Sequence, residues 1–384
     1  MSKSSCIGLF SSDFAWKEPF SAKDLDNWGG VGEAVYHIAL ELNARGYDVE
    51  VFTSSSGNYS KTEYQNVTVH KYGKTILFAD SKLSLELVYR HLREDIDLIH
   101  VHRGLPPGAI GGYLHTLISR KPFVFTAHGD LHYYEGLVRT GLLAGFEALS
   151  THMLERADVV TTVTEEFCAN SSYLESYRDE TRVVPNGVKV PNLSDAELKT
   201  DNLDPHTNNT ILFLGKLESR KNPLELIRAI PIVRSQFPDS QFVFLGEGEL
   251  SKVGLDVATD IGVGKYVRFP GFVSEDAKTE YLRSADVFCL PSRNESFGLA
   301  AIEAASYGTP LVLSDIPCFR QLFDDAALFV DSNSPQEIGE TISRILNTES
   351  LRRELSRAAR ERAEQYSWQS VTDKYVTIYQ SLLS

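Results

Sequence analysis

The segment LPSRNESFGLAAIEAASYGTPLVLSD, residues 290–315, combines residue types that can bind an anionic ligand. Its pattern predicts a strand, a loop that carries Glu295, and a helix that opens at Phe297 with Ser296 as its cap. The first backbone N–H groups of this helix, at Phe297, Gly298 and Leu299, lack partners within the helix and favour an anion. Gly298 has no Cβ, so a ligand can approach its backbone closely. The segment therefore predicts a binding site at a helix start.

Glu303 lies further along the same predicted helix among apolar neighbours, which predicts a buried carboxylate. Burying a charge is costly unless it is hydrogen-bonded, and two adjacent hydroxyls such as a ribose diol would satisfy it. The alternative is that Glu295 lies at the surface and that Glu303 pairs with a lysine or an arginine. The combination of strand, loop glutamate, glycine, capped helix and interior glutamate favours a ligand site.

Two lysines stand at the end of another predicted strand, in FLGKLESRKNPLELI, residues 213–227. Lys216 and Lys221 emerge on the loop after this strand, and Pro223 suits the first position of the next helix. Lysines at the mouth of a strand are natural partners for a diphosphate, and they can offset the charge on a departing phosphate. Taken alone, two solvated surface lysines would explain the pattern as well.

Gly29, Gly30 and Gly32 precede a predicted helix in NWGGVGEAVYHIAL, residues 27–40. Small residues there would let a phosphate or a sugar approach the helix start. The spacing differs from the G-x-G-x-x-G dinucleotide pattern, and a tight turn explains the glycines equally well. This cluster is therefore weak evidence of a site.

Two histidines end predicted strands in the first half of the chain, His102 in DLIHVH and His128 in FVFTAHGD. Ligands of doubly wound sheets bind beyond the carboxyl ends of the strands. A histidine there can hydrogen-bond a substrate hydroxyl or handle a proton, although a single histidine is more often structural. We expect His128 to be functional and consider His102 a candidate for contact with an acceptor.

Other chemistries find little support in the sequence. It contains no P-loop, H-E-x-x-H or G-x-S-x-G motif, and its four cysteines are scattered without metal-ligand spacing. The D-x-D triplets at 24–26 and 95–97 are interpreted as surface charge, so no metal site is predicted. The 52 acidic residues outnumber the 38 basic ones, and the resulting net charge of -14 disfavours a nucleic-acid partner.

The candidate residues need elements that bring them to one edge of a sheet. Short apolar runs such as FVFTAH alternate with amphipathic segments through 1–187, break at the polar stretch 188–209, and resume from 210. Continuous apolar runs are typical of parallel strands that helices cover on both faces. The sequence therefore predicts an α/β fold with two doubly wound domains, joined by a linker at 188–209 and facing across a cleft.

The sequence also bears on where the protein works. Its N-terminus lacks the pattern of a secretory signal peptide, and no uncharged apolar run approaches the roughly 20 residues that span a bilayer. We therefore expect a cytoplasmic protein, with peripheral contact at the inner membrane face as the most that membrane association would involve.

At these motifs the chain resembles the GT-B glycosyltransferases of the large retaining family 4, the glycosyl transferases group 1. The resemblance rests on the E-x7-E element from Glu295 to Glu303. It is supported by GGVGEAVYHIALELNARGYDVEVFT, TAHG, VVPNGV, GKLESRKNP, FLGEGE and FPGFV, which cover nearly the whole chain. It implies an N-terminal acceptor-side Rossmann-like domain at 1–187 and a C-terminal nucleotide-sugar-binding domain at 210–366. A helix at 367–384 would pack back on the first domain.

The resemblance also implies roles for the residues of the second domain. Glu303 would bind the ribose of a nucleotide sugar, and Glu295 would contact the transferred sugar with support from the amides of 297–299. Lys216 and Lys221 would bind the diphosphate. Lys216 stands where the family usually has arginine, so a bidentate phosphate grip is lost, and Asn222 replaces the usual glycine after Lys221.

For the remaining positions, the resemblance implies that Gly29 and Gly30 lie near the diphosphate, that Phe272 borders the base, and that His128 contacts the sugar. We assign catalytic roles to His128, Glu295, Lys216 and Lys221.

The function predicted from these observations is that of a hexosyltransferase that needs neither metal nor cofactor. It would move a sugar with retention from a UDP- or GDP-linked donor to a hydroxyl of a sugar, a lipid-linked acceptor or a small molecule. Two other enzymes on the same architecture remain open, a nucleotide-sugar epimerase and a phosphorylase. A catalytically silent subunit that only binds a nucleotide sugar is the non-enzyme alternative.

Overall fold

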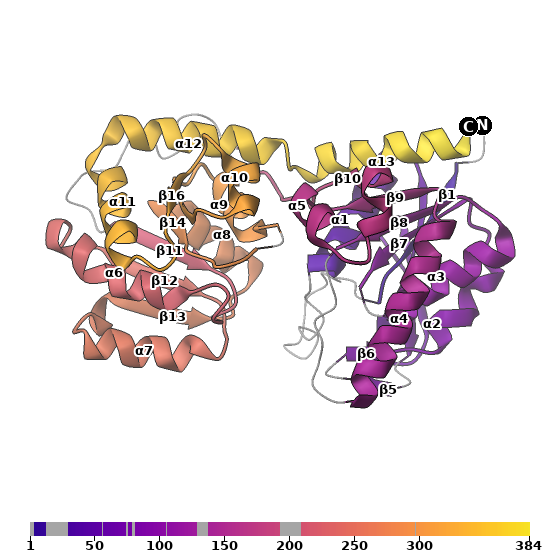
Figure 1. Ribbon diagram of the computed structural model, residues 1–384. Helices are drawn as coiled ribbons and strands as arrows, with labels where there is room; N and C mark the ends of the chain where they lie inside the picture. Colours follow the sequence, from indigo (N-terminus) through magenta and orange to yellow (C-terminus); the bar gives the residue numbers. More distant parts are fainter. Residues whose placement is uncertain are drawn as a thin grey trace. The chain divides into compact units, whose positions relative to one another are not determined.

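A computed structural model describes most of the 384-residue chain: residues 4–12, 30–55, 57–73, 76–78, 81–104, 106–128, 137–192, 209–295 and 297–384. The chain divides into two compact units (Figure 1). Unit 1 comprises Met1–Gly187 together with Trp368–Ser384, and unit 2 comprises Val188–Ser367. The polar stretch predicted as a linker falls largely outside the described residues, because 193–208 are not among them.

The described part of unit 1 contains an eight-stranded sheet in the order β10-β9-β8-β7-β1-β2-β4-β3. All neighbours pair in parallel except β3 with β4. The strands are β1 (Cys6–Phe10), β2 (Asp48–Ser55), β3 (Ser60–Tyr64), β4 (Val67–Gly73), β7 (Leu98–Arg103), β8 (Phe123–Ala127), β9 (Val159–Thr162) and β10 (Arg182–Val183), and the short β5 (Ile76–Phe78) and β6 (Ser81–Leu83) pair separately.

Helices cover both faces of this sheet (Figure 1). Successive β1 residues point to opposite faces, so Leu9 joins the core under α1 and α13, whereas Phe10 joins the core on the other face. This burial on both faces explains why the strands read as continuous apolar runs. The helices are α1 (Gly30–Ala44), α2 (Glu86–Tyr89), η2 (Arg90–Arg93), α3 (Pro106–Ser119), α4 (Leu137–Arg156), α5 (Glu165–Asn170), η3 (Glu175–Glu180) and α13 (Trp368–Leu383).

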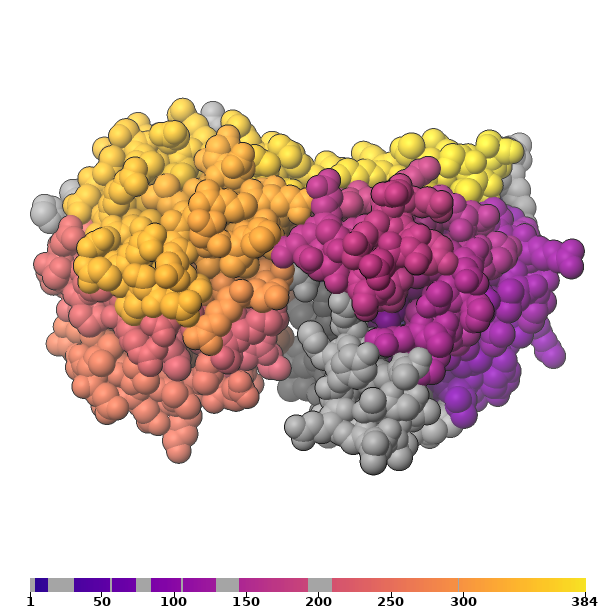
Figure 2. Space-filling view, viewed as in Figure 1, coloured from indigo at the N-terminus to yellow at the C-terminus, as the bar shows by residue number. Residues whose placement is uncertain are grey.

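The last helix, α13, belongs to unit 1 although it follows unit 2 in the sequence. Its apolar side chains Trp368, Val371, Tyr375, Ile378 and Tyr379 are buried in the same core cluster as residues of α1. The ring of Trp368 stacks on His37 of α1, with ring centroids 4.9 Å apart. The opposite side of α13 lies at the surface of unit 1, where it is drawn in yellow (Figure 2).

Unit 2 contains a six-stranded parallel sheet among its described residues, in the order β13-β12-β11-β14-β15-β16. Its strands are β11 (Thr210–Leu214), β12 (Gln241–Leu245), β13 (Val267–Gly271), β14 (Val287–Leu290), β15 (Leu311–Ser314) and β16 (Leu328–Val330). Its helices are α6 (Pro223–Gln236), α7 (Leu250–Asp260), η4 (Gly264–Tyr266), α8 (Glu275–Ser284), α9 (Leu299–Ser306), α10 (Pro317–Phe323), α11 (Pro335–Asn347) and α12 (Glu349–Glu364).

Strand pairing decides which loops meet. In unit 2, β11 and β14 are neighbours, with Ile211 opposite Val287, so the loops that follow them emerge at the same edge. In unit 1, β7 and β8 are neighbours, with His102 opposite Thr126, so the ends of these strands also meet. In unit 2 the sheet thus brings the loop that carries the two lysines to the loop that carries Glu295. In unit 1 it brings the two histidines together.

One element differs from the sequence-based expectation: the helix expected to open at Phe297 begins at Leu299. No helix of sufficient length and apolarity to cross a membrane occurs among the residues that could be searched.

Candidate functional site

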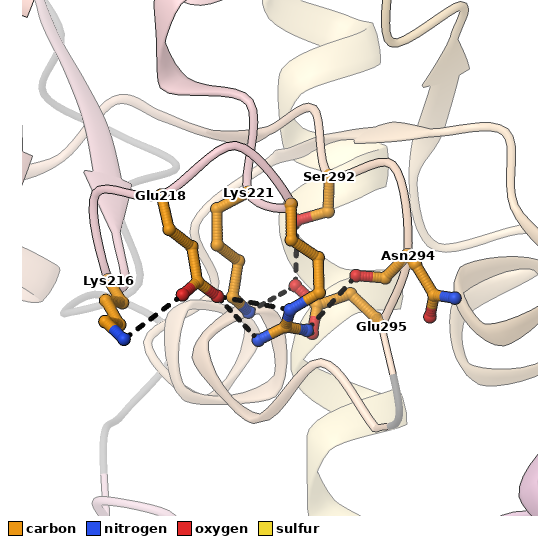
Figure 3. Close-up of polar contacts among 7 residues, drawn as sticks. Lys216, Glu218, Lys221, Ser292, Asn294 and Glu295 are labelled. Carbon is orange, nitrogen blue, oxygen red and sulfur yellow. Dashed lines mark hydrogen bonds and ion pairs between the residues drawn. The ribbon is translucent and has the colours of Figure 1, made fainter. Parts of the chain in front are cut away.

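A cluster of charged side chains lies at the carboxyl edge of the unit 2 sheet. Figure 3 shows Lys221, on the loop after β11, directed toward Glu295 on the loop after β14, where Ser292 also contacts Glu295. On the first of these loops, Lys216 is directed toward Glu218. The two loops are also joined through their backbones, because Arg293 N–H donates to the Arg220 carbonyl at 2.8 Å. The two loops therefore form one continuous polar site.

Glu295 is the buried centre of this cluster. Its side chain is only 5% exposed, and its Oε1 accepts hydrogen bonds from Lys221 Nζ and, at 2.8 Å, from Ser292 Oγ. Lys221 is itself only 13% exposed. The alternative in which Glu295 lies at the surface does not hold, because its side chain is buried. Charge-assisted hydrogen bonds fix the Lys221 ammonium group in one position.

The outer part of the cluster is built on Glu218. Its carboxylate contacts Lys216 Nζ at 3.3 Å and the Arg220 guanidinium at 3.0 Å. Burial alone would raise the pKa of Glu218, but Arg220 and Lys216 outweigh burial and lower it. Lys216 is 70% exposed, so its head group is the most solvated of the three cations. Arg220 also reaches Glu295, with Nη1 3.6 Å from Oε2.

Asn222 explains how this loop turns into α6 without the usual glycine. Its φ of 56° lies in the left-handed region, which asparagine tolerates better than other residues with a Cβ. Its side-chain amide donates to the Ser332 carbonyl at 2.6 Å and anchors the turn next to β16. The helix start behind Lys221 is therefore preserved.

The start of α9 differs from the expected capped helix. Gly298, with a φ of 71°, is the N-terminal flanking residue of α9, and Ser296 lies outside the described residues. A Cβ at Gly298 would lie 2.6 Å from the ring of Phe319, so backbone conformation and packing alone require glycine here. Phe297 is buried with its ring edge-on to Tyr366. The first amide of the helix proper is therefore that of Leu299, not that of Phe297.

Glu303 also differs from the expectation, which was a buried carboxylate that no cation of the protein contacts. Its side chain is 25% exposed, and Lys278 Nζ donates to its Oε1 at 2.9 Å. Burial alone would lower the pKa of Lys278, but Glu303 and Glu275 outweigh burial and raise it. The pairing with a lysine, which was the alternative, is thus present. A carboxylate accepts several hydrogen bonds, so this pairing does not by itself occupy Glu303.

The remaining predicted positions of the donor site are spread over both units. Phe272 is 52% exposed just after β13, at the same edge of the unit 2 sheet. Its backbone N–H donates to Glu247 Oε1 at 3.4 Å. Gly30 is the first residue of α1 in unit 1, whereas Gly29 lies outside the described residues.

In unit 1 the two predicted histidines are in direct contact. His102 Nδ1 and His128 Nε2 are 2.9 Å apart, at hydrogen-bond distance. His102 is fully buried at the end of β7, so direct contact with an acceptor, as expected from the sequence, is not supported. Burial lowers the pKa of His128 to about 4, and burial together with His100 and His128 lowers the pKa of His102. Both imidazoles are therefore neutral near pH 7.

Sequence reasoning missed several partners in these sites. Arg220 and Glu218 lie in the motif GKLESRKNP, so the sequence shows that they are near Lys221 along the chain. It does not show the contacts that Arg220 makes with Glu218 and Glu295. The sequence does not indicate Lys278, because it lies on α8 and meets Glu303 of α9 only in the folded structure.

One group of potential metal ligands occurs among the searched residues, Glu50, His70 and Glu94 in unit 1. His70 hydrogen-bonds Glu50 at 3.1 Å, and Glu94 pairs with Lys61 at 3.6 Å. These side chains thus have partners within the protein.

Comparisons with known proteins agree with this architecture. The family model described as Glycosyltransferase Family 4 matches residues 28–190, and that described as Glycosyl transferases group 1 matches residues 194–362. The phosphatidyl-myo-inositol mannosyltransferase of Mycobacterium leprae is 27% identical over 92% of this chain and 93% of its own length. The D-inositol 3-phosphate glycosyltransferase of Corynebacterium kroppenstedtii is 25% identical, over 95% and 88% respectively.

Among solved structures, Anabaena HepE in complex with UDP and glucose superposes with a TM-score of 0.72 at 17% identity, over 99% of this chain and 100% of that one. Two Rossmann-like units with this topology form the GT-B fold. The chain belongs to the family-4 type of these enzymes, the glycosyl transferases group 1, and is a hexosyltransferase.

Proposed function

We propose that this enzyme transfers a hexose, with retention and without a metal ion, from a UDP- or GDP-linked donor held by unit 2. The observation that carries the proposal is the charged cluster at the edge of the unit 2 sheet, where Lys221 and Glu295 form a buried pair. The carboxyl edge of a parallel sheet is where such folds bind ligands. Lys216 and Arg220 add two further cations to the same edge.

The cations of the cluster would act on the diphosphate. Lys221 is held in place by Glu295, so its ammonium group needs little reordering when a phosphate oxygen arrives. Lys216 is solvated and contacts Glu218 in this structure. On ligand binding it can turn from Glu218 toward the outer phosphate. As the bond to the sugar breaks, negative charge grows on the leaving diphosphate, and these cations stabilise it in the role that a metal ion has elsewhere.

The helix start and Glu303 would hold the other parts of the donor. The Leu299 amide at the start of α9 favours a polar or anionic group of the ligand. Glu303 can keep its contact with Lys278 and still accept the two hydroxyls of a ribose. Phe272, exposed at the same edge, offers a ring on which a base can stack.

For the acceptor, we propose a hydroxyl of an inositol-type polyol, free as a phosphate or carried by a lipid. The names of two relatives support this class of acceptor, phosphatidyl-myo-inositol in one and inositol 3-phosphate in the other. Unit 1 would contact the acceptor, and His128 at the end of β8 would contact the transferred sugar. A lipid-borne acceptor would require peripheral contact with a membrane surface.

The test is a transfer assay with UDP- and GDP-hexoses, each offered with inositol phosphate, with phosphatidylinositol vesicles, or alone. Released nucleotide and glycosylated product are measured by mass spectrometry. We expect transfer from one donor base, and at least a tenfold loss in Lys221→Ala and in Glu303→Ala. Arg228→Ala is the matched control, because Arg228 is exposed on α6 and pairs with Glu225. Full activity in both site variants would remove the assigned donor site.

A further inference from the structure

Glu218 is the carboxylate on which the outer part of the charged cluster is built. Its Oε2 atom lies 3.3 Å from Lys216 Nζ, and its Oε1 atom lies 3.0 Å from Arg220 Nη2 and 3.1 Å from Arg220 Nε. Figure 3 shows Lys216 and Glu218 facing each other. One carboxylate therefore occupies two of the three cations that the proposed function assigns to the diphosphate.

The contact with Arg220 uses a particular edge of the guanidinium group. The Nε–H and Nη2–H groups lie side by side and form an edge with which an arginine binds a carboxylate or a phosphate bidentately. In this structure both groups contact Oε1 of Glu218. The third nitrogen, Nη1, is directed elsewhere, at 3.3 Å from the Asn294 carbonyl oxygen and 3.6 Å from Glu295 Oε2. A phosphate that binds this edge of Arg220 has to displace Glu218.

This edge of Arg220 matters because Lys216 stands where the family usually has arginine. An ammonium group is a point charge and does not bind a phosphate with two parallel hydrogen bonds, as a guanidinium group does. Arg220 is the only arginine in the segment 215–222, between β11 and α6. On this loop a bidentate contact with a phosphate can therefore come only from the residue that Glu218 now occupies.

Exposure indicates which contacts of the cluster open most easily. The inner pair is buried, since Lys221 is 13% and Glu295 only 5% exposed, and a buried ion pair is costly to break. Glu218 is 20% exposed and its partner Arg220 is 43% exposed. Ion pairs open to solvent contribute little to stability. The outer contacts can therefore be exchanged for a ligand while the inner pair stays in place.

Such an exchange requires no change in the backbone of the loop. The Glu218 carbonyl oxygen accepts hydrogen bonds from the N–H groups of Lys221 and Asn222, at 3.1 and 3.2 Å. These bonds form the turn that leads into α6, and they do not involve the carboxylate. Rotation of the Glu218 side chain is enough to release both cations. A carboxylate that stayed beside them would repel an incoming diphosphate, because the two groups carry charge of the same sign.

We propose that Glu218 is an internal substitute for the donor diphosphate: it holds Arg220 and Lys216 while the donor is absent, and the diphosphate displaces it. Glu218 thereby lowers the affinity of this site both for the donor and for the nucleoside diphosphate that is released as product. The assignment of a nucleotide sugar as the ligand rests on the proposed function. The competition itself concerns any diphosphate that binds these cations.

The experiment compares the wild-type protein with Glu218→Gln and Glu218→Ala by calorimetric titration with UDP, GDP and inorganic pyrophosphate. Glutamine removes the charge and keeps the shape of the side chain, whereas alanine also removes the acceptor. We expect both variants to bind diphosphates about 2-fold to 30-fold more tightly, because two exposed ion pairs no longer compete with the ligand. In an Arg220→Met background, the fold-gain from Glu218→Gln should be less than half as large.

Glu249→Gln is the matched control. Glu249 is exposed and precedes Leu250, whose N–H donates to the Leu217 carbonyl at 2.9 Å, so this variant removes the same charge beside the same loop. It should change the affinity by less than about 2-fold, because solvent and salt screen a charge that is not paired with the cations of the cluster. Circular dichroism verifies that each variant is folded.

Unchanged or weaker binding of diphosphates in both Glu218 variants would overturn the proposal, because Glu218 would then order the cations instead of competing for them. A gain of the same size in the Arg220→Met background would also overturn it. Tighter binding of pyrophosphate by the Glu218 variants, without binding of UDP or GDP, would support the exchange and contradict the proposed donor. If neither the wild type nor the variants bind any diphosphate, both the proposed function and this inference are wrong.

Discussion

Replacement of Lys221 by methionine tests the charged cluster most sharply, because it should change stability and ligand binding together. The substitution keeps the aliphatic stem and removes the ammonium group from Glu295, whose side chain is 5% exposed. Leaving a buried charge without its partner costs about 3–5 kcal/mol. Arg220 at 3.6 Å and Ser292 at 2.8 Å still contact the carboxylate, so we expect about 2 kcal/mol of destabilisation.

Nucleotide binding should weaken in the same variant for a separate reason. Hydrogen bonds to charged groups contribute about 1.5–3 kcal/mol, so losing the contact between Lys221 and a phosphate should weaken UDP or GDP binding about 10-fold to 150-fold. The stability change is measured by urea denaturation, and the affinity by calorimetric titration.

The double variant Lys221→Met with Glu295→Gln separates these two effects. It removes the unpaired charge, so we expect stability to return toward that of the wild type while nucleotide affinity stays low. Lys216→Met is the matched control for stability, because this lysine is 70% exposed and should change stability by less than about 0.5 kcal/mol. Wild-type affinity in Lys221→Met, or a double variant as unstable as the single one, would refute the reasoning.

Three further predictions concern stability and mechanism. Burial lowers the pKa of His91 and of His100 to about 3; the second cause is His115 for His91 and His128 for His100. Below about pH 6.5 the unfolded chain therefore binds protons that the folded chain does not. The contribution of these histidines to the free energy of unfolding is therefore fully present above about pH 6.5, and it should fall on acidification by on the order of 2 kcal/mol per histidine at pH 5. Urea midpoints that do not change between about pH 5 and 7 would contradict this. Gly298→Ala should cost about 1–3 kcal/mol, because of the positive φ and the contact with Phe319, and a thermal melt like that of the wild type would argue against the described start of α9. Transfer should persist in excess EDTA and give a product with the anomeric configuration of the donor, which ¹H NMR of the early product reads directly; loss in EDTA or inversion would contradict the proposed mechanism.

The parts of the fold that the sequence predicts well are those with continuous apolar runs. The runs that end at Leu214 and Leu290 are buried strands, and their neighbouring positions bring Lys221 to Glu295. Runs of this kind are short, continuous and bounded by polar loops, so both the strands and the functional edge follow from the pattern.

The missed elements have a different physical origin. The edge strand β3, SKTEY, is polar because one side of it faces solvent. The helix α7 contains Gly254, which weakens a helical pattern, yet a Cβ there would lie 3.0 Å from Ile227 and 3.1 Å from Phe269. Tertiary packing requires that glycine, and a local pattern does not reveal tertiary packing.

The same limit applies to the candidate site. The sequence identifies Glu303 as an interior residue of a helix, but its partner Lys278 comes from another helix, so the pairing depends on the tertiary fold. Likewise, the order of strands β7 and β8 brings His102 to His128, whereas the sequence shows only that each ends a strand.

The central claim is that unit 2 binds a nucleoside diphosphate through Lys221 and Glu303, and calorimetric titration with UDP, GDP and the matching monophosphates tests it most directly. We predict that one diphosphate binds, at least tenfold more tightly than its monophosphate, and that both Lys221→Met and Glu303→Gln weaken it by about tenfold or more. If neither UDP nor GDP binds, or if both variants bind as the wild type does, this site is not the donor site.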